Sequence, residues 1–258
     1  MKEYYNNFMV INYKKVLFVF LPFLLSKFFL NAQIGKSDQS SIYYNWFDSS
    51  VNFENTSLFN GVFFNDRYLT INEKHRFFEV PDFLRGSIDY DGQEYFDLSM
   101  KYDVHGDEVL VKLKRGYGEI TLQLIKSNVH SFTIDNHRFI NINKKDDNNT
   151  SSIHGFHESL LETSIFILLK KHKKNVKRRE RNKVVYYEFL SKNEYVLYYN
   201  DSYHYVNNKS DFIKVFPKFK KDIDSYYNAS RALKRSNKDL FNQTLLRRIF
   251  TLLSKEDN

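Results

Sequence analysis

Hydrophobic and polar residues alternate from about residue 56 to residue 143. The clearest stretch is GSIDYDGQEYFDLSMKYDVHGDEVLVKL, residues 86–113. A period of two is typical of strands with one buried face and one solvated face. The alternation is interrupted at Asp91-Gly92 and at His105-Gly106-Asp107, where the residues favour turns. The pattern therefore predicts three antiparallel strands joined by two turns.

More strands are predicted after this meander. Three short ones are EITLQLI (119–125), SFTI (131–134) and HRFINI (137–142). The segment KKDDNNTSS (144–152) has no apolar residue and predicts a loop or a boundary. The next segment, HGFHESLLETSIFILLKK, is compatible with a helix or with strands, and its β-branched residues favour strands. Residues 183–208 are rich in Val and Tyr and predict a second meander.

The hydrophobic period lengthens to three and four residues after residue 208, as in an amphipathic helix. Pro217 lies inside this stripe, and we expect it to divide the segment into two short helices. A final amphipathic helix is predicted at DLFNQTLLRRIFTLLSK (239–255), with Ser236 and Asp239 as its capping box.

Strands followed by more strands and then by helices indicate an α+β fold. We expect antiparallel β meanders that form a sheet, an open sandwich or a barrel, followed by C-terminal helices. The predicted domains are a β-rich domain at 33–208, with a candidate internal boundary at 144–152, and a helical segment at 209–258 that packs on the sheet.

The first 32 residues have the pattern of a secretory signal peptide. Lys14-Lys15 precede an apolar run from Val16 to Leu25, and Ala32 is a small residue at a suitable cleavage position. The run is shorter than the roughly 20 apolar residues of a spanning helix, although an uncleaved anchor is the alternative. We therefore predict export to the periplasm, the outer membrane or the exterior. The chain contains no cysteine, which excludes disulfides, thiolate metal sites and a cysteine nucleophile.

Charge is unevenly distributed along the chain, whose formal net charge is +8. Residues 33–170 carry a net charge of −6, whereas 171–183 carry +7 and 209–258 carry +6. An exported protein meets anionic lipid, glycolipid and envelope proteins, so we expect these partners and no nucleic acid. The predicted contacts to an anionic surface are Lys171, Lys173, Lys174, Lys177, Arg178, Arg179, Arg181 and Lys183. The alternative for this run is a solvated loop at the tip of a hairpin.

Motifs of common enzymes and cofactor sites were not found in the sequence. It contains no G-x-S-x-G, H-E-x-x-H or glycine-rich phosphate loop, so we predict no catalytic residue and no cofactor. His154 and His157 are weak candidates for metal ligands, because in a strand they would face opposite sides. Five aspartates between residues 89 and 107 are interpreted as turn residues rather than as paired catalytic carboxylates.

Four segments carry a resemblance to a known group of proteins: the signal end NAQ, the meander GSIDYDGQEYFDLSMKYDVHGDEVLV, the strand NHRFINI and the segment KSDFIKVFPKFKKDI. Across about residues 56–254 the chain resembles an uncharacterised group of exported proteins from Bacteroidota. The hallmarks of the group match Tyr90, Asp91, Gly92, Gln93 and Tyr95 in the hairpin, and Phe216-Pro217 later. The resemblance implies export and a shared architecture, and it implies no activity.

These observations lead to one hypothesis of function and two alternatives. The hypothesis is a non-enzymatic scaffold of the cell envelope that docks through the basic loop and the C-terminal helices. One alternative is a protein that binds glycans or small ligands on aromatic strands, with candidates in IYYNWF (42–47) and at Tyr195, Tyr198, Tyr199, Tyr203 and Tyr205. The other is a metal-assisted hydrolase. The oligomeric state is not predicted.

Overall fold

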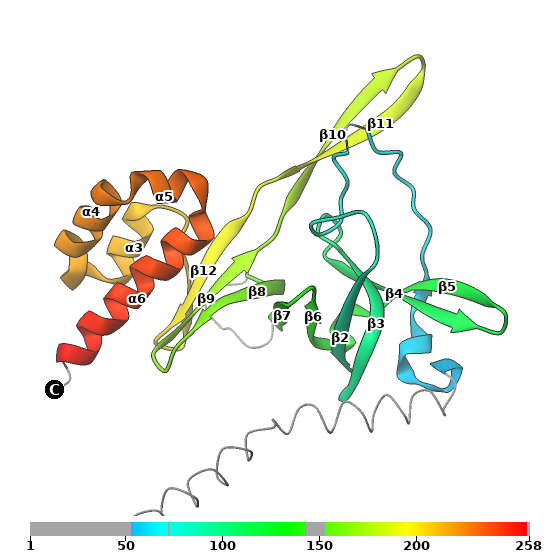
Figure 1. Cartoon of the computed structure of the whole chain (residues 1–258), viewed down its shortest axis with the longest axis horizontal. Helices are drawn as coiled ribbons and strands as arrows, with labels where there is room; N and C mark the ends of the chain where they lie inside the picture. Colours follow the sequence, from blue (N-terminus) through cyan, green and yellow to red (C-terminus); the bar gives the residue numbers. More distant parts are fainter. Residues whose placement is uncertain (1–52, 72, 143–152, 257–258) are drawn as a thin grey trace, which may run out of the picture. The chain divides into compact units, whose positions relative to one another are not determined.

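The computed structural model describes residues 53–256, except Asn72 and residues 143–152 (Figure 1). All of these residues belong to one compact unit, Phe47–Asn258. The predicted signal peptide with its cleavage after Ala32, the aromatic segment 42–47 and the boundary at 144–152 lie outside the described residues.

The first meander forms as the alternation predicts. Its strands are β2 (Leu84–Tyr90), β3 (Gln93–Asp103), β4 (Glu108–Arg115) and β5 (Gly118–Gln123). The next two predicted strands, β6 (Val129–Ile134) and β7 (His137–Ile142), also form, and β6 pairs with β2 on the other side of the meander. A short β1 (Val62–Phe63) pairs with β5. Short 3₁₀ turns lie at Phe53–Asn55, Ser57–Asn60 and Lys126–Asn128.

The segment that was compatible with helix or strand forms two strands, β8 (Gly155–Glu162) and β9 (Phe166–Lys171). With β12 (Glu194–Tyr199) and β13 (Ser202–Tyr205) they complete an antiparallel sheet of 11 strands. Its order is β1-β5-β4-β3-β2-β6-β7-β8-β9-β12-β13. The sheet is open, with β1 and β13 at its edges, and it is not closed into a barrel.

The basic run is a strand and not a loop, which corrects the expectation of a charged hairpin loop. β10 (Lys174–Arg181) pairs with β11 (Val184–Ser191) in a second sheet of two strands. Only Asn182 and Lys183 form the turn.

Four α-helices follow the strands: α3 (Lys209–Val215), α4 (Lys220–Ala229), α5 (Arg231–Ser236) and α6 (Lys238–Glu256). A 3₁₀ turn that begins at Pro217 separates α3 from α4, as predicted. The predicted cap of the last helix is wrong by one residue. Asn237 accepts the backbone N–H of Leu240 on its side-chain oxygen (2.9 Å), whereas the Ser236 hydroxyl donates back to Leu233. The fold is therefore α+β, with the helices after the sheet.

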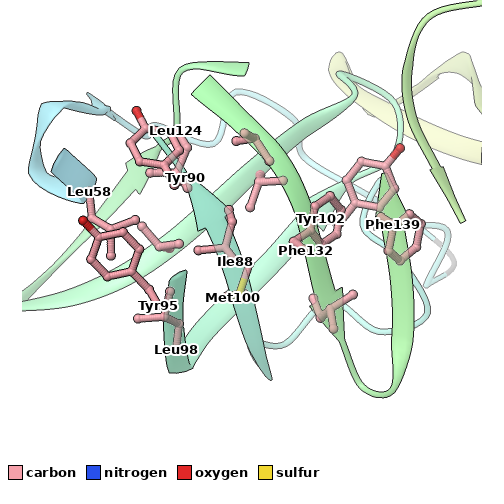
Figure 2. Close-up of a cluster of buried hydrophobic side chains, with 14 of the residues drawn as sticks. Leu58, Ile88, Tyr90, Tyr95, Leu98, Met100, Tyr102, Leu124, Phe132 and Phe139 are labelled. Carbon is pink, nitrogen blue, oxygen red and sulfur yellow. The ribbon is translucent and has the colours of Figure 1, made fainter. Parts of the chain in front are cut away.

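Two main hydrophobic cores are built on the large sheet. The first packs strands β2 to β7, and its aromatic centre includes Tyr102, Phe132 and Phe139 (Figure 2). The second packs β8, β9 and β12 against the helices, with Phe212 and Phe241 fully buried. None of the helices in the described part of the chain is long and apolar enough to cross a membrane.

Candidate functional site

The β10–β11 pair, residues 174–191, is called the basic ribbon below. It continues the hairpin that β9 and β12 form in the large sheet (Figure 1). Lys171 pairs with Glu194 in the sheet, and Lys174 pairs with Ser191 in the ribbon. Because both pairs have the same register, the ribbon is a direct extension of two buried strands. Its base is therefore fixed by the sheet.

Contacts on one face also hold the base of the ribbon in place. The Lys174 ammonium donates to the carbonyl oxygens of His75 (2.9 Å) and Phe77 (2.6 Å). Burial lowers the pKa of Lys174 to about 8. Tyr68 packs edge-on against Phe189, with ring centroids 5.3 Å apart, and the backbone N–H of Phe189 donates to the Lys74 carbonyl.

Beyond this anchored base, every residue from Asn175 to Val184 is exposed. Residues 174–191 contain six basic and two acidic side chains, a net charge of +4. Apolar side chains are exposed among them: Val176, Val184 and Leu190 are 44%, 40% and 39% exposed. The free part of the ribbon therefore presents positive charge together with apolar side chains.

The structure divides the eight predicted surface contacts between two places. Five lie exposed on the ribbon: Lys177, Arg178, Arg179, Arg181 and Lys183. Arg179 also donates to Glu188, a buried carboxylate on β11 (2.9 Å). The other three are engaged at or below the base of the ribbon, since Lys174 is anchored, Lys173 pairs with Glu194 (2.6 Å) and Lys171 is buried.

Lys171 lies beside a cavity of about 300 Å³. Residues from the β3–β4 turn, from Lys126 and from β8, β9, β12 and β13 line it. The Lys171 ammonium lies 2.7 Å from Oδ1 of Asp107, and Lys126 donates to Oδ2 of the same carboxylate. Burial of Lys171 lowers its pKa to about 8. The cluster brings together three charged groups that are far apart in the sequence.

The two candidate metal ligands, His154 and His157, both line this cavity. His154 is exposed and His157 is buried. Within residues 53–142 and 153–256, no group of three or more His, Asp or Glu side chains is arranged to hold a metal ion.

A second histidine cluster lies beside the first core. The Glu158 carboxylate is shared by His137 on Oε1 and His172 on Oε2, with the latter bond 2.6 Å long. Burial alone would raise the pKa of Glu158, but these two hydrogen bonds lower it below its usual value. Phe78 packs against both imidazoles, so the cluster is part of the packing between β7, β8 and the end of β9.

The aromatic strands hold most of their tyrosines in packing contacts. Tyr195 is buried and donates its hydroxyl to Asp239 of α6 (2.5 Å). Tyr199 packs on Phe216, and Tyr198 packs on Tyr203. Tyr205, the last of the five tyrosines predicted as candidates for ligand binding, lines the cavity beside Lys171.

Comparisons with family models, with curated proteins and with solved structures gave no match for this chain. The candidate sites are therefore defined by their own geometry. Sequence patterns indicated the ribbon through its charge. They did not indicate the cavity cluster, because Asp107, Lys126 and Lys171 form no local motif.

Proposed function

We propose that this protein is an exported protein of the cell envelope, and that its basic ribbon docks it to an anionic lipid surface. The observation that carries this proposal is the exposed part of the ribbon, where five cationic side chains accompany exposed Val176 and Val184. Each Lys or Arg close to an anionic membrane contributes about 1 kcal/mol of attraction, and apolar side chains add affinity by entering the interface.

The fixed base of the ribbon supports the same proposal. A flexible loop loses conformational entropy when it is ordered on a surface. Here the backbone is already hydrogen-bonded from Lys174 to Arg181, and Lys174 is tied to the carbonyls of His75 and Phe77. Most of that entropy is therefore lost on folding rather than on docking.

This proposal is narrower than the hypothesis from the sequence, which included the C-terminal helices. Leu245, Leu246 and Ile249 of α6 are buried in the second core. Because the apolar face of this helix is occupied by packing, we assign docking to the ribbon alone.

The test is co-sedimentation with vesicles of phosphatidylcholine that contain phosphatidylserine. In the test variant, Lys177, Arg178, Arg181 and Lys183 are changed to Glu. Arg179 is kept because it pairs with buried Glu188. In the control variant, four exposed basic residues of the helical part are changed to Glu: Lys214, Lys220, Lys221 and Arg235. Both variants change the net charge of the protein by the same amount.

We expect the unmodified protein to pellet with the anionic vesicles but not with pure phosphatidylcholine, and added salt should weaken the binding. The ribbon variant should stay in the supernatant, while the helix variant still pellets. Equal loss in both variants would show that only net charge matters and would refute the assignment to the ribbon. Pelleting of neither the unmodified protein nor its variants would refute lipid docking.

Export is the premise of this proposal, and it has a separate test. The N-terminal pattern predicts that protein recovered from the cell envelope begins at Gln33. Recovery of an intact chain from the cytosolic fraction would contradict export, whatever the vesicle experiment gives.

A further inference from the structure

The cavity beside Lys171 is separate from the exposed part of the ribbon, and its chemistry suggests a different ligand. Three lysines line it, Lys126, Lys171 and Lys173, together with two carboxylates, Asp107 and Glu194. With its histidines neutral, this set has one positive charge in excess. Its volume of about 300 Å³ is at the lower end of the range for small-molecule sites.

The Asp107 carboxylate carries one negative charge and contacts two ammonium groups, so the positive charge of one of them is not offset. Its Oδ1 accepts the Tyr102 hydroxyl (2.7 Å) and faces the Lys171 ammonium (2.7 Å), and its Oδ2 accepts from Lys126. The Lys171 ammonium also donates to the Phe156 carbonyl (3.0 Å). An ammonium group has three donors, which leaves Lys171 and Lys126 further N–H groups for a ligand.

Gly155 makes the approach of these groups possible. Its φ is +82°, a conformation that favours glycine, and a Cβ at this position would lie 2.0 Å from Oδ2 of Asp107. The same Cβ would lie 2.9 Å from the Lys126 ammonium and 3.0 Å from that of Lys171. The missing side chain therefore provides the space in which two ammonium groups meet one carboxylate.

His157 adds an acceptor to the same cavity. Its Nδ1 lies 2.9 Å from the Gly155 carbonyl oxygen, which can only accept, so Nδ1 carries the proton. In the neutral imidazole Nε2 is then an acceptor. His157 lines the cavity and is 2% exposed. The cavity thus offers cationic donors and a neutral acceptor.

We propose that this cavity binds a small oxyanion that also carries a hydroxyl group, such as a phosphate monoester or a carboxylic acid of a short polyol. The oxyanion would accept from Lys126 and Lys171, and the hydroxyl would donate to Nε2 of His157. This inference goes beyond the docking function and does not depend on it.

The probes are glycerol 3-phosphate, inorganic phosphate and glycerol, measured by isothermal titration calorimetry on the full-length mature protein. We expect saturable binding of one glycerol 3-phosphate per chain, weaker binding of inorganic phosphate, and none of glycerol. Charged hydrogen bonds contribute about 1.5–3 kcal/mol each, so Lys171→Met should weaken glycerol 3-phosphate binding by about tenfold or more.

Two further variants keep the test informative if Lys171→Met fails to fold. Lys126→Met removes the second ammonium group from a side chain that is 38% exposed, so the fold should tolerate it. It should also weaken binding about tenfold. Lys114→Met is the matched control, because Lys114 is an exposed residue of β4 that does not line the cavity.

Absence of saturable binding in the folded, unmodified protein would overturn the proposal, and so would equal loss in Lys114→Met and Lys126→Met. The same phosphate chemistry occurs in lipid head groups, and the vesicle assay separates the two sources. If Lys126→Met loses glycerol 3-phosphate but still pellets with vesicles, the ligand is a soluble anion. If it loses both, the cavity binds the head group of a lipid.

Discussion

At the scale of single residues, the buried charges around the cavity make the fold sensitive to pH. Burial, followed by the positive charge of Lys171, lowers the pKa of His157 from 6.5 to about 4. Between these two values, the unfolded chain binds a proton at this histidine and the folded chain does not. The unfolding free energy should therefore fall as the pH falls from 6.5 towards 4.

The contribution of His157 can be isolated with His157→Gln, which cannot titrate. The difference between 6.5 and about 4 corresponds to about 3 kcal/mol of unfolding free energy. Between neutral pH and pH 4, the unmodified protein should lose about that much more stability than His157→Gln in denaturant titrations. Exposed His130 on β6 serves as the control, and His130→Gln should keep the full acid sensitivity. Parallel losses in the protein and in His157→Gln would contradict the prediction.

Residues such as these also show the limit of prediction from sequence. The basic run in the sequence predicted that all eight of its cationic side chains contact one anionic surface. Lys171, however, is 8% exposed and lines the cavity. Its partners Asp107 and Lys126 are distant in sequence, and β9 is linked to β3 only through the ladder of β2, β6, β7 and β8. Local patterns contain no information about such contacts. The local patterns correctly predicted that residues 171–183 are positively charged, but they could not predict which residues contact Lys171.

At the scale of elements, the hairpin turns explain which strands could be predicted. Two-residue turns with both φ values positive join β2–β3, β6–β7, β10–β11 and β12–β13. Three of them use residues that tolerate this conformation well: Asp91-Gly92, Asp135-Asn136 and Asn200-Asp201. The fourth is Asn182-Lys183, and a lysine gives no turn signal. The sequence therefore indicated a long charged loop where the structure has strand β10 and a tight turn, whereas β11 lies in the region 183–208 that was predicted to form strands.

This turn provides a prediction for the ribbon. Lys183 has a φ of 62°, which costs a residue with a Cβ about 1 kcal/mol relative to glycine. Lys183→Gly should therefore stabilise the β10–β11 pair, and amide hydrogen exchange in residues 175–190 should slow several-fold. Lys192→Gly, at an exposed position that does not have positive φ, should not slow exchange. Faster exchange in Lys183→Gly would show that the turn differs from the one described.

The charges of β10 also have a role that needs no ligand. In the described part of the chain, the ribbon sheet contains β10 and β11 only, so one edge of β10 has no strand partner. Charged side chains on an edge strand oppose pairing with another molecule. The docking test therefore replaces basic residues by Glu and not by neutral residues, because Glu keeps the edge charged while it reverses the attraction to anionic lipid.

At the scale of the whole molecule, one continuous sheet supports two large, separate sets of buried side chains and a small third one of Ile142, Ile153, Leu169 and Val196. Residues of the first core lie between Leu58 and Phe156, and those of the second lie between Leu161 and Ile249. The backbone ladder from β7 through β8 to β9 connects them. The order of strands and helices was predictable because each segment has its own hydrophobic period. The division into two cores was not, because it depends on which strands the helices cover.

Two cores on one sheet should open separately in native-state hydrogen exchange. Phe132 and Phe241 are matched positions, being 2% and 0% exposed in the first and second core. Replacing either one by Leu should cost about 1 kcal/mol, which leaves the protein folded. Phe241→Leu should speed amide exchange mainly in β12 and the helices, and Phe132→Leu mainly in β2 to β7. If each variant instead speeds exchange equally along the whole described chain, the two cores unfold as one cooperative unit. The prediction that they open separately would then be wrong.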